Sequence, residues 1–90
     1  MTIDIAALLA EAQKLHDQDA RITASIEVIF HDNFTSFSFS VMERGRYDKN
    51  YRAINRESRM AWELAKLNST DKLIAELRHM LETVKSRIEK

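Results

Sequence analysis

The chain has no cysteine and no proline, and Gly45 is its only glycine. Without cysteine it can form neither a disulfide nor a thiolate metal site, and it offers no thiol nucleophile. A single glycine cannot build the glycine-rich loops that bring several backbone N–H groups close to a phosphate. These absences exclude thiol chemistry, P-loops and Rossmann-type nucleotide turns.

The chain also lacks a net charge and a long apolar run. Its 14 Lys and Arg residues balance its 14 Asp and Glu residues, so no overall field draws it to nucleic acid or to an anionic membrane. No apolar stretch approaches the roughly 18 residues that cross a bilayer. Asp4 stands where a signal peptide carries a basic residue. We therefore expect a cytoplasmic protein with no membrane partner.

What remains has the composition and length of one small globular domain, with 90 residues of which 44% are hydrophobic. Apolar residues recur with helical period over residues 3–17, 48–67 and 70–89. They alternate with polar residues over 20–31 and 34–43, which predicts two strands. The predicted fold is α+β in the order α-β-β-α-α, an antiparallel β-hairpin packed against helices. One long helix bent near 68–71 is the alternative for the last two helices.

The register of the hairpin follows from a two-residue turn at Asp32-Asn33, which puts the paired apolar residues on one face. The predicted pairs are Val28 with Phe37, Ile26 with Phe39 and Ala24 with Val41 on that face, and Glu27 with Ser38 and Ser25 with Ser40 on the other. Ile29, Phe34 and Met42 fall on the second face. There they form a small contact patch, unless the helix at 48–67 covers them.

The second strand carries no charge or proline over residues 35–41, so it lacks the usual protection against pairing at an exposed edge. We predict that this edge pairs with a second copy to give a homodimer, or with a strand of another protein. The predicted edge consists of Ser36, Phe37, Ser38, Phe39 and Ser40.

Residues 44–59 form the one basic segment. Its cations are Arg44, Arg46, Lys49, Arg52, Arg56 and Arg59. Arginine binds phosphate groups and tyrosine stacks on unpaired bases, so the segment suits nucleic acid. An acidic protein partner is an alternative, and so is a solvated face neutralised by the acidic first third of the chain. A helix over 48–67 places Tyr51 on the apolar side, opposite the cations.

No residues are predicted to be catalytic, to ligate a metal or to bind a cofactor. His16, His31 and His79 lack ligand spacing, and strand alternation accounts for the serines. By elimination we expect a non-enzymatic protein-binding module without a small-molecule substrate. It would be an adaptor or inhibitor that occupies a surface of a larger protein or nucleoprotein complex. In size and composition it looks like the small proteins by which phages and mobile elements block host machinery. The alternative is a nucleic-acid-binding module that uses the basic segment, and a small enzyme is a third hypothesis.

Overall fold

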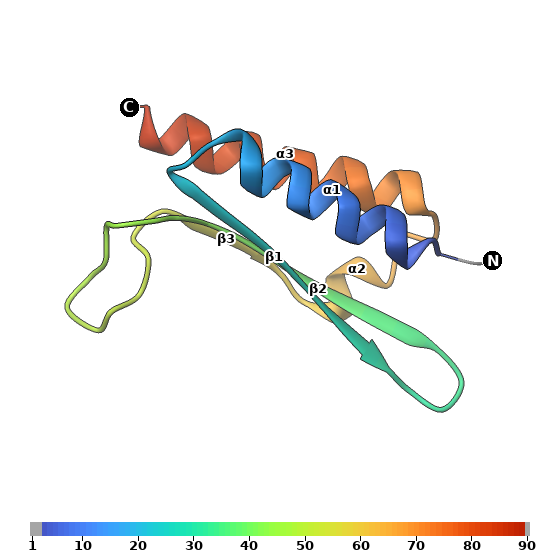
Figure 1. Cartoon of the computed structure of the whole chain (residues 1–90). Helices are drawn as coiled ribbons and strands as arrows, with labels where there is room; N and C mark the ends of the chain where they lie inside the picture. The colour runs from blue at the N-terminus through green and yellow to red at the C-terminus, as the bar shows by residue number, and fades with distance from the viewer. Residues whose placement is uncertain (1–2, 90) are drawn as a thin grey trace.

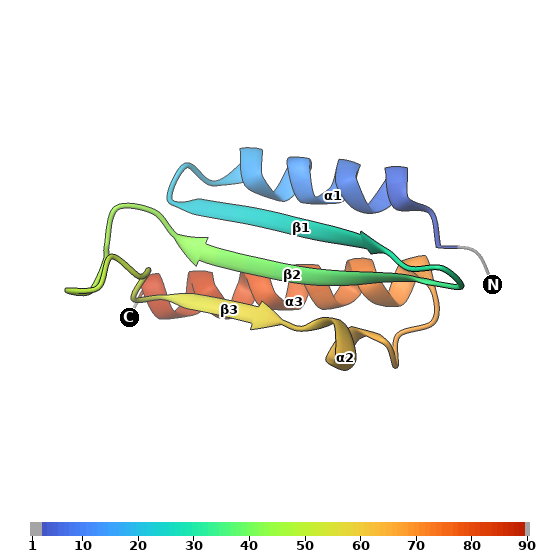
Figure 2. The ribbon, with the colours of Figure 1, turned by 90° about the horizontal axis from the view of Figure 1, so that it is seen from below.

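The computed structural model describes residues 3–89 and contains three helices and three strands within them. These are α1 (Ile5–Gln18), β1 (Ile22–Phe30), β2 (Thr35–Glu43), β3 (Arg56–Arg59), α2 (Ala61–Leu64) and α3 (Thr70–Ile88). The strands form one antiparallel sheet in the order β1-β2-β3. Helices α1 and α3 lie side by side on one face of this sheet (Figure 1), and the opposite face carries no helix (Figure 2). The α+β class is confirmed, with a third strand inserted between the hairpin and the last two helices.

Both long helices begin at a side chain that caps the first turn. The Asp4 carboxylate accepts a hydrogen bond from the Ala7 N–H (3.0 Å), and the Ser69 hydroxyl accepts one from the Lys72 N–H (3.2 Å). Such caps satisfy N–H groups that have no partner within the helix. The polar residues before α3 therefore separate it from α2, and the single bent helix does not form.

The hairpin of β1 and β2 has the predicted register. Val28 pairs with Phe37, Ile26 with Phe39 and Ala24 with Val41, as the apolar alternation requires. The turn at Asp32-Asn33 is closed by the His31 N–H, which donates to the Phe34 carbonyl (2.8 Å).

The core lies between this sheet and the two long helices. Because the strands alternate, most apolar side chains of β1 and β2 point toward α1 and α3, and the serines point to the bare face together with Ile29 and Met42. The fully buried side chains are Leu8 of α1, Ile22 of β1, Val41 of β2, and Leu73, Leu77, Met80 and Val84 of α3. The core thus fixes the sheet on the helix pair and leaves the loops at both ends to carry surface features.

The predicted helix at 48–67 is wrong, because only Ala61–Leu64 is helical there. Residues 56–59 instead form β3, whose inward side chains are charged. Glu57 contacts Arg87 and Arg59 contacts Glu76, both across the interface with α3. A strand that faces its helix with ion pairs shows no apolar alternation in the sequence. Inward charges of this kind also discourage pairing at the outer edge of such a strand.

The third strand also corrects the prediction of a free edge on β2. Strand β2 is central, and its Phe39 and Ser40 pair with Arg59 and Ser58 of β3. Only the part from Ser36 to Ser38 lies beyond the end of β3. The edge of β1 is flanked by α1, which runs alongside it (Figure 2).

Candidate functional site

The six basic residues predicted to form one contact surface are divided between different parts of the fold. Arg59 lies on the helix face, where Glu57 (2.9 Å) and Glu76 (2.8 Å) hold it and raise its pKa. The Arg44 guanidinium donates to the Ile22 carbonyl at 2.8 and 3.1 Å and therefore anchors the end of the hairpin. The single helical arc of cations does not exist, since residues 48–55 are not helical.

The other four cations, Arg46, Lys49, Arg52 and Arg56, are exposed at one end of the sheet. The first three belong to residues 44–55, which we call the basic arm. The arm connects the end of β2 to the start of β3 and extends beyond the sheet (Figure 1). Backbone hydrogen bonds cross it from the Glu43 N–H to the Asn55 carbonyl (2.9 Å) and from the Ile54 N–H to the Arg46 carbonyl (3.1 Å). The arm is therefore a folded hairpin.

The tip of the basic arm is organised by Asp48. Its Oδ1 accepts hydrogen bonds from the Asn50 N–H (2.8 Å) and the Arg52 N–H (3.0 Å). Within this turn Tyr51 adopts a positive φ of 62° and is 90% exposed. The prediction that Tyr51 lies on an apolar face is wrong, because that face depended on the helix.

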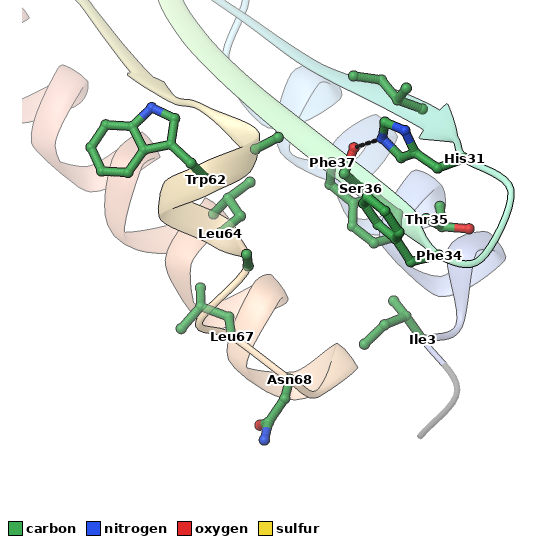
Figure 3. A pocket seen from close by; sticks show the side chains of 13 residues that line it. Ile3, His31, Phe34, Thr35, Ser36, Phe37, Trp62, Leu64, Leu67 and Asn68 are labelled. Atoms are coloured by element: carbon green, nitrogen blue, oxygen red, sulfur yellow. Dashed lines mark hydrogen bonds between the residues drawn. The ribbon is translucent and has the colours of Figure 1, made fainter.

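An apolar groove of about 600 Å³ lies at the opposite end of the sheet, between the hairpin tip and α2 (Figure 3). Thirteen residues line it: Ile3, Ile29, His31, Phe34, Thr35, Ser36, Phe37, Ala61, Trp62, Leu64, Ala65, Leu67 and Asn68. Ile29 and Phe34 of the predicted contact patch are among them. Met42 is not, because it pairs with Arg56 near the basic arm. Sequence reasoning did not find the groove as a whole, since α2 was hidden in the predicted longer helix.

Aromatic side chains mark both sides of the apolar groove. On the hairpin, the His31 ring stacks on Phe34 with centroids 4.2 Å apart, and His31 Nε2 lies 2.9 Å from the Ser36 hydroxyl. These contacts hold Phe34 in place although it is 63% exposed. On α2, Trp62 is 72% exposed and points away from the hairpin tip (Figure 3). The apolar surface therefore continues from the groove onto the outer side of α2.

One wall of the apolar groove is the uncovered part of the β2 edge. Hydrogen bonds alternate along an antiparallel pair, and the His31 N–H bond to Phe34 sets their phase. The backbone groups of Thr35 and Phe37 therefore point away from β1, like those of Phe39, which meets Arg59 of β3. Because β3 ends at Arg59, the backbone groups of Thr35 and Phe37 have no hydrogen-bond partner within residues 3–89.

The carboxyl groups with shifted pKa values belong to ion pairs that join elements of the fold. Arg78 of α3, at 2.6 Å, lowers the pKa of Glu11 on α1. Arg59, with Arg87, lowers the pKa of Glu57. Arg21 lowers the pKa of Asp19 to about 2 at the turn between α1 and β1. We assign these pairs a structural role, because each fastens one element to its neighbour.

Among the described residues, no group of three or more His, Asp or Glu side chains could hold a metal ion. No helix within residues 3–89 is long and apolar enough to span a membrane.

Comparison of the chain with protein-family models, with curated proteins and with solved structures gives no match.

Proposed function

We propose that this protein is a non-enzymatic protein-binding module whose contact surface is the apolar groove. The observation that carries the proposal is the pair of exposed aromatic side chains, Phe34 and Trp62, on either side of an apolar hollow. Exposed apolar patches of this kind mark interaction sites in folded proteins. Buried aromatic anchors, with tryptophan and tyrosine enriched, supply much of the energy at protein interfaces.

The occupant we propose is an extended segment of a partner protein with apolar side chains. The free backbone groups of Thr35 and Phe37 support this choice, because they offer hydrogen bonds to an added strand where β3 has ended. Strand addition obtains affinity from such main-chain bonds and specificity from pockets for alternate side chains. The groove beside Phe37 supplies the pocket.

By holding an extended segment of its partner in this groove, the protein would act as a small adaptor or inhibitor of a larger protein or nucleoprotein complex. We expect it to act in the cytoplasm. Homodimerisation stays a prediction. The surface expected to form the dimer has changed, because β3 pairs with Phe39 and Ser40 of the predicted edge. A second copy could reach only the part from Ser36 to Ser38, within the same groove.

The test is a selection of peptides from a random library against the folded protein, followed by affinity measurement on variants. We expect apolar, extended peptides that lose at least tenfold in affinity on Trp62→Ala combined with Phe34→Ala. The matched control is Leu9→Ala, which removes an apolar side chain of α1 that is 48% exposed and does not line the groove. Selection of no peptide, or an equal loss with the control, would contradict the proposal.

Methylating single backbone nitrogens of the selected peptide tests strand addition directly. Alternate nitrogens of an added strand face β2, so methylation should abolish binding at every second position and be tolerated between them. A helical peptide would instead be weakened at successive positions in its centre. Trp62, the only tryptophan, reports self-association. An emission blue shift that grows with protein concentration would assign the groove to a second copy.

A further inference from the structure

The basic arm combines exposed cations with an exposed aromatic ring. Arg46, Lys49 and Arg52 are exposed, and Tyr51 between them is the most exposed large hydrophobic residue of residues 3–89 at 90%. Arg46 lies 3.4 Å from Glu43, yet its side chain is 58% exposed. The one acidic residue of the arm, Asp48, directs Oδ1 at two backbone N–H groups. The tip therefore presents positive charge around a ring.

The backbone of Tyr51 is in a conformation that disfavours its side chain. A φ of 62° is uncommon for any residue except glycine, and it is an outlier for a bulky one. Asn50, its immediate neighbour, belongs to a residue type that tolerates this region better. Strained residues of this kind concentrate at ligand-binding positions. Asp48 nevertheless closes the turn so that Tyr51 occupies the strained position with its ring in solvent.

We propose that the basic arm binds single-stranded nucleic acid, with a base stacked on Tyr51 and phosphates contacting Arg46, Lys49 and Arg52. Every base offers a face for stacking, and a positive groove or finger that follows the backbone completes a sequence-tolerant site. Duplex DNA fits less well, because its bases are already stacked. An acidic protein would meet the cations, but the carboxylate side chains that pair with them carry no base or ring on which Tyr51 could stack. This site is separate from the apolar groove and does not depend on the protein-binding proposal.

The first experiment is fluorescence anisotropy with labelled oligo(dT) and oligo(U) of about 12 nucleotides, a length within the usual range of site sizes. Three phosphate contacts predict a slope of about −2 for log affinity against log salt. Raising the salt from about 50 to about 200 mM should therefore weaken binding about 20-fold.

The second experiment replaces the ring and relieves the backbone in one step, with Tyr51→Gly. Loss of one stacked base should weaken oligonucleotide binding by about 5- to 150-fold. Glycine is at ease at positive φ, so the melting temperature should not fall. Tyr51→Phe, which keeps the ring, is the matched control and should bind like the wild type.

The third experiment separates phosphate contact from general charge. Lys49→Gln combined with Arg52→Gln should reduce the salt slope to about −0.7, the value for one remaining contact. Lys14→Gln combined with Lys66→Gln removes the same charge from exposed positions outside the arm and should leave the slope near −2.

Three outcomes would overturn the proposal. One is no binding of either oligonucleotide at low salt. Another is binding that Tyr51→Gly leaves unchanged, which would make the contact electrostatic only. The third is equal or tighter binding of a polyglutamate peptide, which would assign the arm to an acidic protein.

Discussion

The two ends of β2 carry surfaces of opposite chemistry. At its start, Thr35 and Phe37 form a wall of the apolar groove, and beyond its end at Glu43 the chain enters the basic arm. The nine residues of β2 span about 30 Å of extended chain between the two ends. The recognition proposed at the groove would depend on removing apolar surface from water, whereas the recognition proposed at the arm would depend on charge and weaken with salt. The difference teaches that one strand of a small domain can hold two surfaces of different chemistry apart.

The two ends also differ in how they are held in place. Ion pairs cluster beneath the basic arm, where Glu57 of β3 meets Arg87 of α3 and Asp19 meets Arg21. The groove end relies on packing of Phe37 and Leu64 and on the contacts of the His31 ring.

The largest effect is expected from a substitution that weakens the core on which both ends of β2 rest. Leu77 of α3 is fully buried in the core, so Leu77→Ala should lower the free energy of unfolding by about 2 to 5 kcal/mol. Urea denaturation followed by circular dichroism measures this loss. The domain, and with it both surfaces, should unfold in one transition. Two separate transitions would show that the ends are not mounted on a common core.

The next effect should act mainly at the arm end. Glu57→Gln removes the charge that Arg59 and Arg87 contact and should cost about 1 to 3 kcal/mol at neutral pH. Because the folded-state pKa of Glu57 is lowered, the wild type keeps this stability above the ordinary value of 4.5 and loses it as the pH falls through the folded value.

Amide hydrogen exchange locates that loss. Acidification below 4.5 should lower the protection factors, which correct for the pH dependence of intrinsic exchange, in β3 more than in the β1–β2 pairs near the groove. An equal loss of protection at both ends would contradict the contrast.

A smaller effect is expected at the turn between α1 and β1. Asp19→Asn keeps the side-chain oxygen that accepts the Arg21 N–H but removes the charge. The Arg21 side chain is 47% exposed, so screening by water should limit the cost to about 1 kcal/mol or less. The lowered pKa of Asp19 means that this stability is present above 3.8 and is lost as the pH falls toward about 2. Urea midpoints of wild type and variant should therefore converge in strong acid.

The smallest effects are expected when each variant is tested with the probe of the other surface. They test most sharply whether the groove and the basic arm are independent. Trp62→Ala should leave oligonucleotide affinity within about twofold, and Tyr51→Gly should do the same for a groove-binding peptide. Substitutions at distant sites without shared contacts usually add within about 0.5 kcal/mol. Anisotropy titrations of both variants with both probes measure this. A change beyond twofold in either crossed combination would show that the two ends are coupled.

Part of the fold could be predicted from local pattern alone. The hairpin register followed from alternation, because a shift of one residue would have exposed Phe39 and Val41. The helix starts are local in the same sense, because the side chains of Asp4 and Ser69 cap the first turns of their own helices. In both cases the residues that specify the structure are neighbours in the sequence.

The rest depended on distant partners. Residues 48–67 show helical periodicity, yet Tyr51, which that helix would place on its apolar side, is 90% exposed, and Trp62 is 72% exposed. The observed element, β3, pairs with β2 and is joined to α3 by ion pairs of Glu57 with Arg87 and of Arg59 with Glu76, residues that lie far apart in sequence. Ion pairs of this kind leave no apolar periodicity in the sequence. The candidate surfaces were affected in the same way, because the groove forms only where α2 meets the hairpin tip.

The sequence by itself therefore determined the α+β class, the hairpin with its register, the two capped helices and the presence of a basic segment, since each rests on local periodicity, capping or composition. Only the tertiary structure decided that β2 is central, that Tyr51 is displayed and that an apolar groove lies beside Phe37. The central position of β2 and the groove result from contacts of β2 with β3 and α2, which lie far from it in the sequence, and Tyr51 is displayed because residues 48–55 are not helical.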